Sequence, residues 1–203
     1  MSDVEKVLTN LSKRNMKGIA VQTKEEAVTK ILQLIPQDAS IGFGGSVTLE
    51  EIGILNELRN QKNRNLLDRT TVQSGEDRQS LYQKMFGCDV FLSGTNAITE
   101  KGQLVNVDGI GNRIAMITYG PKKVIIVVGK NKIVTDLDAA MHRLKTVAMP
   151  INLKRVREAA KQSTLFSSME WTKETIWGQI SIIERQVDPD RITVIIVDKD
   201  LGF

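Results

Sequence analysis

Two glycine-rich segments of the sequence combine the residue types that can bind an anion. The first, GFGGS at 42–46, follows a short apolar run and directly precedes a helix-start signal. The second, NVDGIGNRI at 106–114, has the same order of apolar run, glycines and helix start. Backbone N–H groups in such turns bind phosphate or carboxylate, particularly where a helix begins. A tight turn in which glycine only supplies a positive φ angle is the alternative explanation.

The first segment differs from the two common nucleotide-binding patterns. A Walker loop requires Gly-Lys before Ser or Thr, and the dinucleotide fingerprint requires a third glycine where Val47 stands. The order of strand, glycine turn and capped helix is nevertheless shared with both patterns. We therefore predict an anion site to which the hydroxyl groups also contribute. The predicted ligand-binding residues of this segment are Gly42, Gly44, Gly45, Ser46 and Thr48.

Two more polar segments, SGTNAIT at 93–99 and GKNK at 129–132, also follow predicted strands. In a parallel sheet the carboxyl ends of the strands share one edge, where ligands bind. Arg113, in the first turn of a predicted helix, suits a bidentate contact with carboxylate or phosphate. A surface arginine beside an Asx turn at 108–109 is the alternative. We predict one shared site, whose further residues are Thr95, Asn96, Asp108, Gly109, Gly111, Asn112, Arg113, Lys130 and Asn131.

Metal chemistry has little support in the sequence. The chain has one histidine, His142, and one cysteine, Cys88, which cannot form a zinc site or an iron–sulfur cluster by themselves. We predict no metal site, a partly exposed helical position for His142, and a small core position for Cys88. If the chain is an enzyme, the candidate bases or nucleophiles are Glu50, Glu51 and Asp108.

The composition is that of a soluble protein of about one domain. Of the 203 residues, 41% are apolar and 26% are charged, and the net charge is +4. No apolar run reaches the roughly 18 residues of a membrane span, and the first residues lack the apolar core of a secretory signal. A single cysteine is typical of a cytoplasmic protein. Nucleic acid binding is not expected, because aromatic residues are scarce and the basic clusters, at 122–123, 130–132 and 154–157, are small and fit solvated helix faces.

Predicted helices and strands alternate along most of the chain. This order indicates an α/β fold with a mostly parallel sheet flanked by helices. We assign residues 1–18 to an N-terminal helix and 19–203 to one α/β domain. Pro150 is predicted to end a helix at 136–148, and the strands 179–184 and 192–197 are predicted to form a hairpin around the DPD turn at 188–190. The other predicted strands are 18–22, 39–43, 89–94, 104–109 and 124–129, and the other helices are 4–11, 23–35, 77–87, 112–119, one opening at 48 and one from about 152.

Four longer motifs resemble the lactate-utilisation LUD-domain family, and in particular its small lactate utilisation protein C branch. They are GFGGSVTLEEIG at 42–53, FLSGTNAITEKGQLVNVDGIGNR at 91–113, YGPKKVIIVVGKNKIV at 119–134 and DKDLGF at 198–203. The resemblance implies a fold like that of ribose-5-phosphate isomerase, glucosamine-6-phosphate deaminase and coenzyme A transferase. In those enzymes a glycine loop after a strand holds a phosphate or carboxylate, and the loop at 42–48 has the similar place here.

The resemblance also implies a biological role, which is bacterial growth on L-lactate together with two iron–sulfur partner proteins, in a system that oxidises lactate to pyruvate. The chain would then be the anion-binding subunit without a cofactor of its own, and the iron–sulfur clusters would lie only on the partners. One alternative is a stand-alone enzyme that acts on a sugar phosphate or an acyl-CoA. Another is a non-catalytic regulator or assembly protein. Whether the chain forms a homo-oligomer stays open.

One segment departs from the family pattern. Many members carry cysteines between the helix at about 152–160 and the penultimate strand, whereas KQSTLFSSMEWTKETIWG at 161–178 has none. The departure argues against a redox or metal role for the segment. Its bulky apolar residues predict packing against the domain or a contact with another protein, and they are Leu165, Phe166, Trp171 and Trp177.

Overall fold

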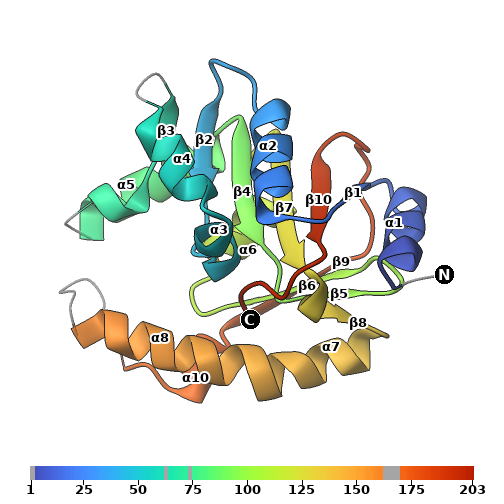
Figure 1. Ribbon diagram of the computed structural model, residues 1–203. Helices are drawn as coiled ribbons and strands as arrows, with labels where there is room; N and C mark the ends of the chain where they lie inside the picture. Colours follow the sequence, from blue (N-terminus) through green and yellow to red (C-terminus); the bar gives the residue numbers. More distant parts are fainter. Residues whose placement is uncertain (1–2, 62–63, 73–74, 162–169) are drawn as a thin grey trace.

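A six-stranded parallel sheet forms the centre of the computed structural model (Figure 1). The structure describes residues 3–61, 64–72, 75–161 and 170–203. All neighbouring strands of this sheet are parallel, which confirms the predicted α/β class with a mostly parallel sheet. In spatial order the strands are β1 (Lys17–Val21), β10 (Ile192–Val197), β7 (Lys123–Gly129), β4 (Val90–Gly94), β2 (Ser40–Phe43) and β3 (Asn65–Leu67).

A second, four-stranded sheet lies across the carboxyl ends of the first (Figure 1). Its position follows from the chain path, because β5 starts three residues after β4 ends and β8 follows β7 after one short 3-10 helix, η2 (Lys130–Lys132). Only the β5–β8 pair is parallel among its pairs in the described ranges. In spatial order its strands are β8 (Ile133–Val134), β5 (Ala97–Thr99), β6 (Leu104–Asp108) and β9 (Gln179–Ile183).

The predicted hairpin of the last two strands is wrong, because the strands belong to different sheets. β9 pairs with β6 in the second sheet, and β10 pairs with β1 and β7 in the first. Every residue of β10 is buried, as expected for an apolar strand covered on both faces of a parallel sheet. Residues of β9 are mostly exposed, which suits its place at a sheet edge. The proline turn between them reverses the chain without pairing its flanks.

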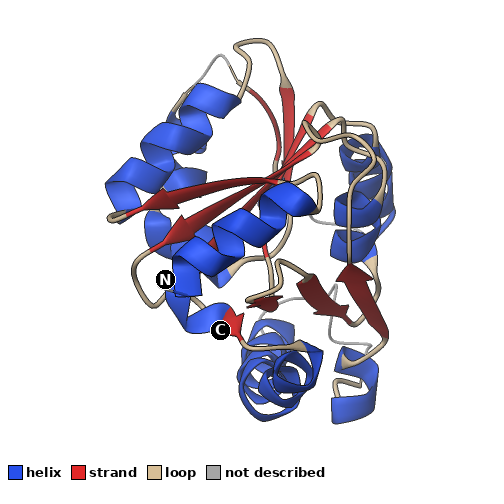
Figure 2. Cartoon of the chain, turned by 90° about the vertical axis from the view of Figure 1, so that its right-hand side faces the viewer, coloured by secondary structure: helices blue, strands red, loops and turns tan. Residues whose placement is uncertain are grey.

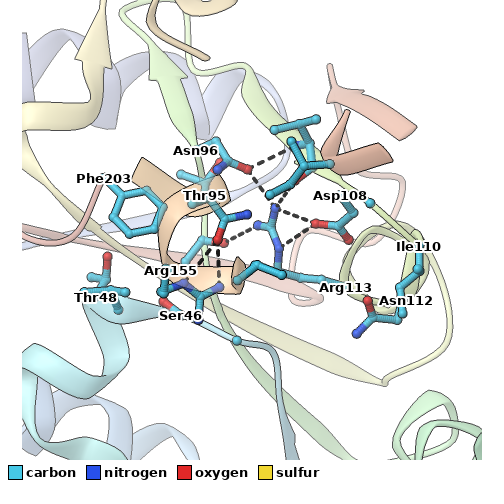
Figure 3. Close-up of a pocket in the computed structure, with 18 of the residues that line it drawn as sticks. Ser46, Thr48, Thr95, Asn96, Asp108, Ile110, Asn112, Arg113, Arg155 and Phe203 are labelled. Atoms are coloured by element: carbon cyan, nitrogen blue, oxygen red, sulfur yellow. Dashed lines mark hydrogen bonds and ion pairs between the residues drawn. The ribbon is translucent and has the colours of Figure 1, made fainter. Parts of the chain in front are cut away.

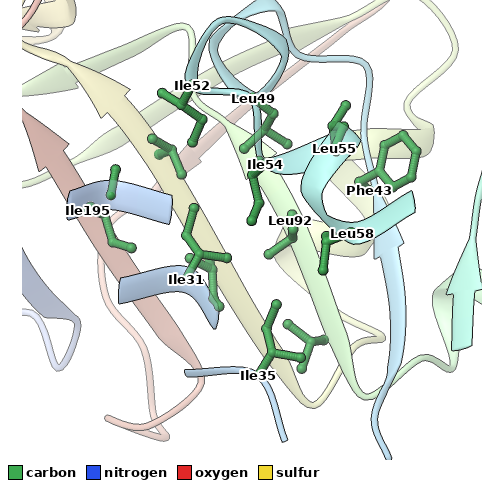
Figure 4. Packing of buried hydrophobic residues seen from close by; sticks show 14 of the residues in the cluster. Ile31, Ile35, Phe43, Leu49, Ile52, Ile54, Leu55, Leu58, Leu92 and Ile195 are labelled. Carbon is green, nitrogen blue, oxygen red and sulfur yellow. The ribbon is translucent and has the colours of Figure 1, made fainter. Parts of the chain in front are cut away.

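Helices cover both faces of the main sheet. One face packs against α2 (Lys24–Leu34), α3 (Val47–Ile52) and α4 (Ile54–Asn60), and Figure 4 shows this cluster around Ile195 and Leu92. The other face packs against α1 (Asp3–Lys13), α5 (Gly75–Phe86), α6 (Asn112–Thr118) and part of the second sheet. Alternate residues of β7 enter the two clusters, as the period of a strand requires. Val7 and Leu11 of α1 are fully buried, so α1 is part of the core.

A long helical segment runs beneath the second sheet, and Figure 2 shows it nearly end on. It consists of α7 (Leu137–Arg143), a π-helical turn η3 (Leu144–Ala148) and α8 (Met149–Lys161). The prediction that Pro150 ends the helix is therefore wrong. Proline lacks an N–H and its ring crowds the carbonyl four residues earlier. The π turn, in which the Met149 N–H donates to the Leu144 carbonyl, widens the helix directly before the proline.

The short helix α10 (Lys173–Ile176) packs against α8. Trp171 and Ile176 are buried there against Leu153, which agrees with the predicted packing of this segment. Leu165 and Phe166 lie outside the described residues. None of the helices within the described ranges is both long and apolar enough to cross a membrane.

Candidate anion-binding site

A cavity of about 210 Å³ opens where the two sheets meet, at the carboxyl edge of the main sheet (Figure 3). The loops that follow β2, β4 and β6 form one part of its wall, and side chains of α8 and the segment before α10 form another. The predicted residues that line the cavity are Gly45, Ser46, Thr48, Thr95, Asn96, Asp108, Gly109, Asn112 and Arg113. The strand-end argument therefore brought these residues together around one cavity, while their binding role stays a prediction.

Two of the predicted glycines are packing positions instead of cavity walls. A Cβ at Gly42 would lie 3.1–3.3 Å from Met85, Cys88 and Phe91, all of them buried. A Cβ at Gly44 would lie 3.1 Å from the aliphatic carbons of Arg113. The absence of a side chain at Gly42 lets Phe91 of β4 and the end of α5 pack closely on β2. At Gly44 it leaves room for the side chain of Arg113.

The other predicted residues that lie away from the cavity wall have structural roles. Gly111, directly before α6, has a φ of 77°, a left-handed backbone conformation that only glycine adopts easily. Lys130 is half exposed and forms an ion pair with Asp198 at 2.9 Å. Asn131 accepts a hydrogen bond from the Leu201 N–H at 3.1 Å and donates one to the Gly202 carbonyl at 3.2 Å. It thereby holds the segment whose next residue, Phe203, lines the cavity.

Arg113 is the most highly bonded side chain of the site. Its Nε and Nη2 contact Oδ1 of Asp108 at 3.0 and 2.8 Å (Figure 3). Its Nη1 donates to the Gly94 carbonyl and to Oδ1 of Asn106, and its Nη2 donates to Oδ1 of Asn96 and to the carbonyl of Val107. These contacts join the end of β4 in the main sheet to β6 in the second sheet.

The hypothesis that Arg113 clamps the ligand meets a geometric obstacle. All five N–H donors of a guanidinium are accounted for by the contacts above, and the residue is 9% exposed. Asp108 is equally occupied, because its second oxygen accepts the N–H of Ile114 at 2.7 Å in the first turn of α6. An anion would have to displace one of these partners, so the contacts favour an anchoring role for the pair.

The three candidate bases are not free carboxylates facing the cavity. Glu50 and Glu51 are exposed and lie outside the cavity wall, and Glu51 accepts the N–H of Gly202 at 2.8 Å. Asp108 lines the cavity but is paired with Arg113. General-base catalysis by an unpaired carboxylate of the described cavity wall is therefore not supported by the geometry.

The β2–α3 turn offers free backbone donors. Ser46 accepts the N–H of Leu49 at 3.3 Å and so caps α3, two residues before Thr48, where the sequence analysis places the start of this helix. Within the described part of the chain, the N–H groups of Gly45 and Ser46 have no acceptor, although both residues line the cavity. The guanidinium of Arg69 lies against the same turn, since a Cβ at Gly45 would come within 2.6 Å of its Nη2.

Three basic residues of the cavity wall were missed by the sequence prediction. Arg69 comes from a short 3-10 helix, η1 (Arg69–Thr71), and Arg155 comes from α8. Lys132 ends η2 and lies in the GKNK motif, where the prediction chose Lys130 and Asn131 instead. Arg155 and Lys132 belong to basic clusters that the sequence analysis interpreted as solvent-exposed helix faces. Their position in the cavity wall is seen only in the folded structure.

Lys132 is nearly inaccessible to solvent, at 3% exposed. Its Nζ donates to Oγ1 of Thr48 at 2.8 Å, and no ion pair of the described residues includes it. Burial lowers the pKa of the Lys132 amine to about 7, and the nearby Arg143 and Arg113 guanidinium groups lower this pKa as well. Glu51 opposes the shift weakly, being the last of the causes.

Arg155 and Arg69 extend the positive charge along the cavity. Arg155 donates to Oδ1 of Asn152 through Nε at 3.1 Å and Nη2 at 2.8 Å. Burial lowers the pKa of Arg155, and the neighbouring Arg69 contributes in the same direction. Arg69 has no hydrogen-bond or ion-pair partner in the ranges that the structure describes. An anion placed between these guanidinium groups would relieve their mutual repulsion.

The two scarce residues behave as predicted. Cys88 is 1% exposed, and burial raises the pKa of its thiol to about 11, so the thiolate is disfavoured at neutral pH. His142 is exposed on α7. Among the described residues no group of three or more histidine, cysteine or acidic side chains is placed to hold a metal ion.

These features define a class of protein, namely an α/β protein with a basic cavity at the carboxyl edge of a parallel sheet. The family model of the LUD domain matches residues 4–197, and the chain belongs to that family. No curated protein matches the chain.

One solved structure supports the fold over nearly the whole chain. The crystal structure of a DUF162 family protein from Deinococcus radiodurans superposes with a TM-score of 0.59 at 14% identity, covering 97% of this chain and 99% of that one. Ribose 5-phosphate isomerase A from Neisseria gonorrhoeae has a TM-score of 0.36 at 18% identity, over 56% of this chain and 54% of that one. The isomerase from Plasmodium falciparum gives 0.38 at 17% identity, over 55% and 52%. The two isomerase scores are too low to carry an argument.

Replacing Arg113 should destabilise the whole fold. Arg113→Met removes every donor from the junction and leaves Asp108 buried without its cation, for which we expect a loss of about 3–5 kcal/mol. Arg155→Met is the matched control, because it removes contacts to one asparagine and should cost about 1 kcal/mol. Urea denaturation measures both values, and equal losses in the two variants would contradict the anchoring role.

Lys132 should give the free energy of unfolding a distinct pH dependence. Between about pH 7 and pH 10 the unfolded chain binds a proton at this lysine that the folded protein lacks, so stability rises with pH by up to about 1.4 kcal/mol per unit. Below about pH 7 both states are protonated and the contribution is constant. Lys132→Met removes this rise, so its stability relative to the wild type is greatest at low pH. Urea titrations across this window, with Lys130→Met as the exposed control, test this. Parallel curves for Lys132→Met and the wild type would refute it.

Proposed function

We propose that the chain is the anion-binding subunit of a bacterial lactate-utilisation system that oxidises L-lactate to pyruvate. Its ligand is a small carboxylate or phosphate bound in the cavity between the two sheets. The iron–sulfur clusters of the system reside on partner proteins. Membership of the LUD domain family and the lactate-utilisation motifs in the sequence support the biological role.

The unbalanced charge of the cavity carries the proposal. Arg69, Arg113, Lys132 and Arg155 line it, whereas Asp108 is the one acidic residue that the described wall contains. Asp108 already neutralises Arg113. The remaining basic groups therefore face the cavity without a carboxylate, and such charges are unfavourable away from bulk water unless an anion compensates them.

The size and the donors of the cavity favour a small ligand. A volume of about 210 Å³ is below the roughly 300–1,000 Å³ that is usual for drug-sized ligands. The free N–H groups of Gly45 and Ser46 can bind one end of an anion beside Arg69. Apolar side chains complete the wall at Ile110, Trp171 and Phe203.

Removing Arg69 should weaken anion binding without harming the fold. We expect the wild type to bind phosphate, L-lactate or pyruvate in isothermal titration calorimetry at low ionic strength. Arg69→Gln removes a hydrogen bond to a charged group, which corresponds to a roughly 10- to 100-fold higher Kd. Lys130→Gln is the matched control, because Lys130 pairs with Asp198 away from the cavity. Equal Kd values for the two variants, or no binding by the wild type, would reject the anion site.

The biological role predicts a growth defect that depends on the carbon source. Deleting the gene in its host should prevent or slow growth on L-lactate, and growth on pyruvate should be unaffected because pyruvate is already the oxidised product. A plasmid copy of the wild type should restore growth, and a copy with Arg69→Gln should restore it less well. Normal growth of the deletion strain on L-lactate would contradict this role and leave the anion site itself untouched.

A further inference from the structure

We infer that the amine of Lys132 is a nucleophile that forms an imine with a carbonyl compound carrying an anionic group. The inference rests on the proposed function, since the anionic group of the ligand would occupy the basic cavity. It adds the chemical class of the ligand, an oxo acid or a phosphorylated aldehyde, and a residue that reacts with it. An imine at this position would make binding reversible and covalent.

The placement of Lys132 is the first observation. The residue lines the cavity although it is 3% exposed, and its Nζ contacts the hydroxyl of Thr48 at 2.8 Å. Structural lysines normally place the ammonium in water or beside a carboxylate. Lys132 does neither within the described structure, and this is the arrangement expected of a lysine that works as a neutral amine.

The charges around Lys132 are the second observation. Arg143 on α7 and Arg113 on α6 face it with positive charge, and Glu51 on α3 is the acidic group that opposes them. Arg143 is itself fixed by the carbonyl of Asn96 at 2.7 Å and that of Asn131 at 3.3 Å. Burial and these cations bring the pKa of the amine to about 7, so the neutral amine with its free electron pair is populated at neutral pH.

The division of the cavity wall is the third observation. Arg69 and Arg155 come from η1 and α8, whereas Lys132 comes from η2. The two arginines and the free N–H groups at 45–46 can hold the anionic group, which leaves the amine to meet the carbonyl carbon of the same ligand. The buried side chains of Trp171 and Ile176 line the cavity too, and partial exclusion of water favours an imine over its hydrolysis.

The step is balanced without any redox partner. The electron pair of the neutral amine attacks the carbonyl carbon, and the carbonyl oxygen takes up a proton. Nitrogen then loses its protons as the C=N bond forms, and the former carbonyl oxygen leaves as one molecule of water. The Thr48 hydroxyl, which accepts the hydrogen bond from Nζ, is placed to accept and return a proton during the exchange.

Reductive trapping tests the inference on the full chain. The protein is incubated separately with pyruvate and with ribose 5-phosphate, each time with sodium borohydride, which converts an imine into a stable secondary amine. Intact-mass measurement then counts the adducts, and peptide mapping locates them. Lys130 is the control within the same chain, because it is an exposed lysine two residues away. We expect one adduct at Lys132, at least tenfold more abundant than at Lys130, rising in yield from about pH 6 to pH 8 and prevented by excess inorganic phosphate.

The outcomes separate this inference from the proposed function. Labelling with pyruvate alone identifies an oxo acid, and labelling with ribose 5-phosphate alone identifies a phosphorylated aldehyde. Equal labelling of Lys132 and Lys130 overturns the inference. So does the absence of an adduct when calorimetry still shows binding of the probe, and in that case the anion site stands. Absence of both binding and labelling rejects the two together. Lys132→Arg, which keeps a positive charge but has no amine that can form an imine, should give no adduct.

Discussion

The guanidinium of Arg113 is the contact on which the shape of the molecule depends. It lies where the main sheet ends and the second sheet begins, and it bonds to a backbone carbonyl of the main sheet and to backbone and side-chain groups of the second. In its ion pair with Asp108, the side chain of Arg113 is 11% exposed and that of Asp108 is 9% exposed, so water competes little for the N–H groups of Arg113. Asp108 in turn fixes the start of α6, the helix that carries Arg113. Asp108 and Arg113 therefore fix each other's position, and their contacts hold the loops around the cavity in place.

A rigid junction also explains how the protein tolerates so much positive charge at one place. Arg113 is neutralised inside the framework, and Arg143 is held by two carbonyl groups of the loops. Arg69, Arg155 and Lys132 remain for the cavity. Bringing like charges together weakens a fold, and the extensive core behind the cavity offsets that loss. Binding sites commonly combine local destabilisation of this kind with a firm scaffold.

The sequence predicted the parts of the site that follow strands. Glycine and polar residues at 44–48, 94–96 and 108–113 come directly after apolar runs, and parallel strands bring such ends together. Arg69 could not be found in this way, because it follows β3, a strand of three residues without a clear signal. Arg155 depends on the continuation of a helix past a proline. The choice between Lys130 and Lys132 depends on a 3-10 turn that directs one outward and the other inward. The pairing of β9 and β10 failed for a related reason, since a local turn signal gives no information about distant strand partners.

The π turn at 144–148 sets the rotational phase of everything that follows it in the long helix. A π turn holds one residue more than the α-helical turn it replaces, and each residue of an α-helix advances the side chains by about 100°. A chain shorter by a single residue here could still form an unbroken helix of nearly the same length and the same composition. Arg143, before the turn, would keep its contacts, whereas Arg155, after it, would face a different direction from the cavity. The number of residues in this short stretch, more than the identity of most of them, therefore decides which side chains of α8 face the cavity.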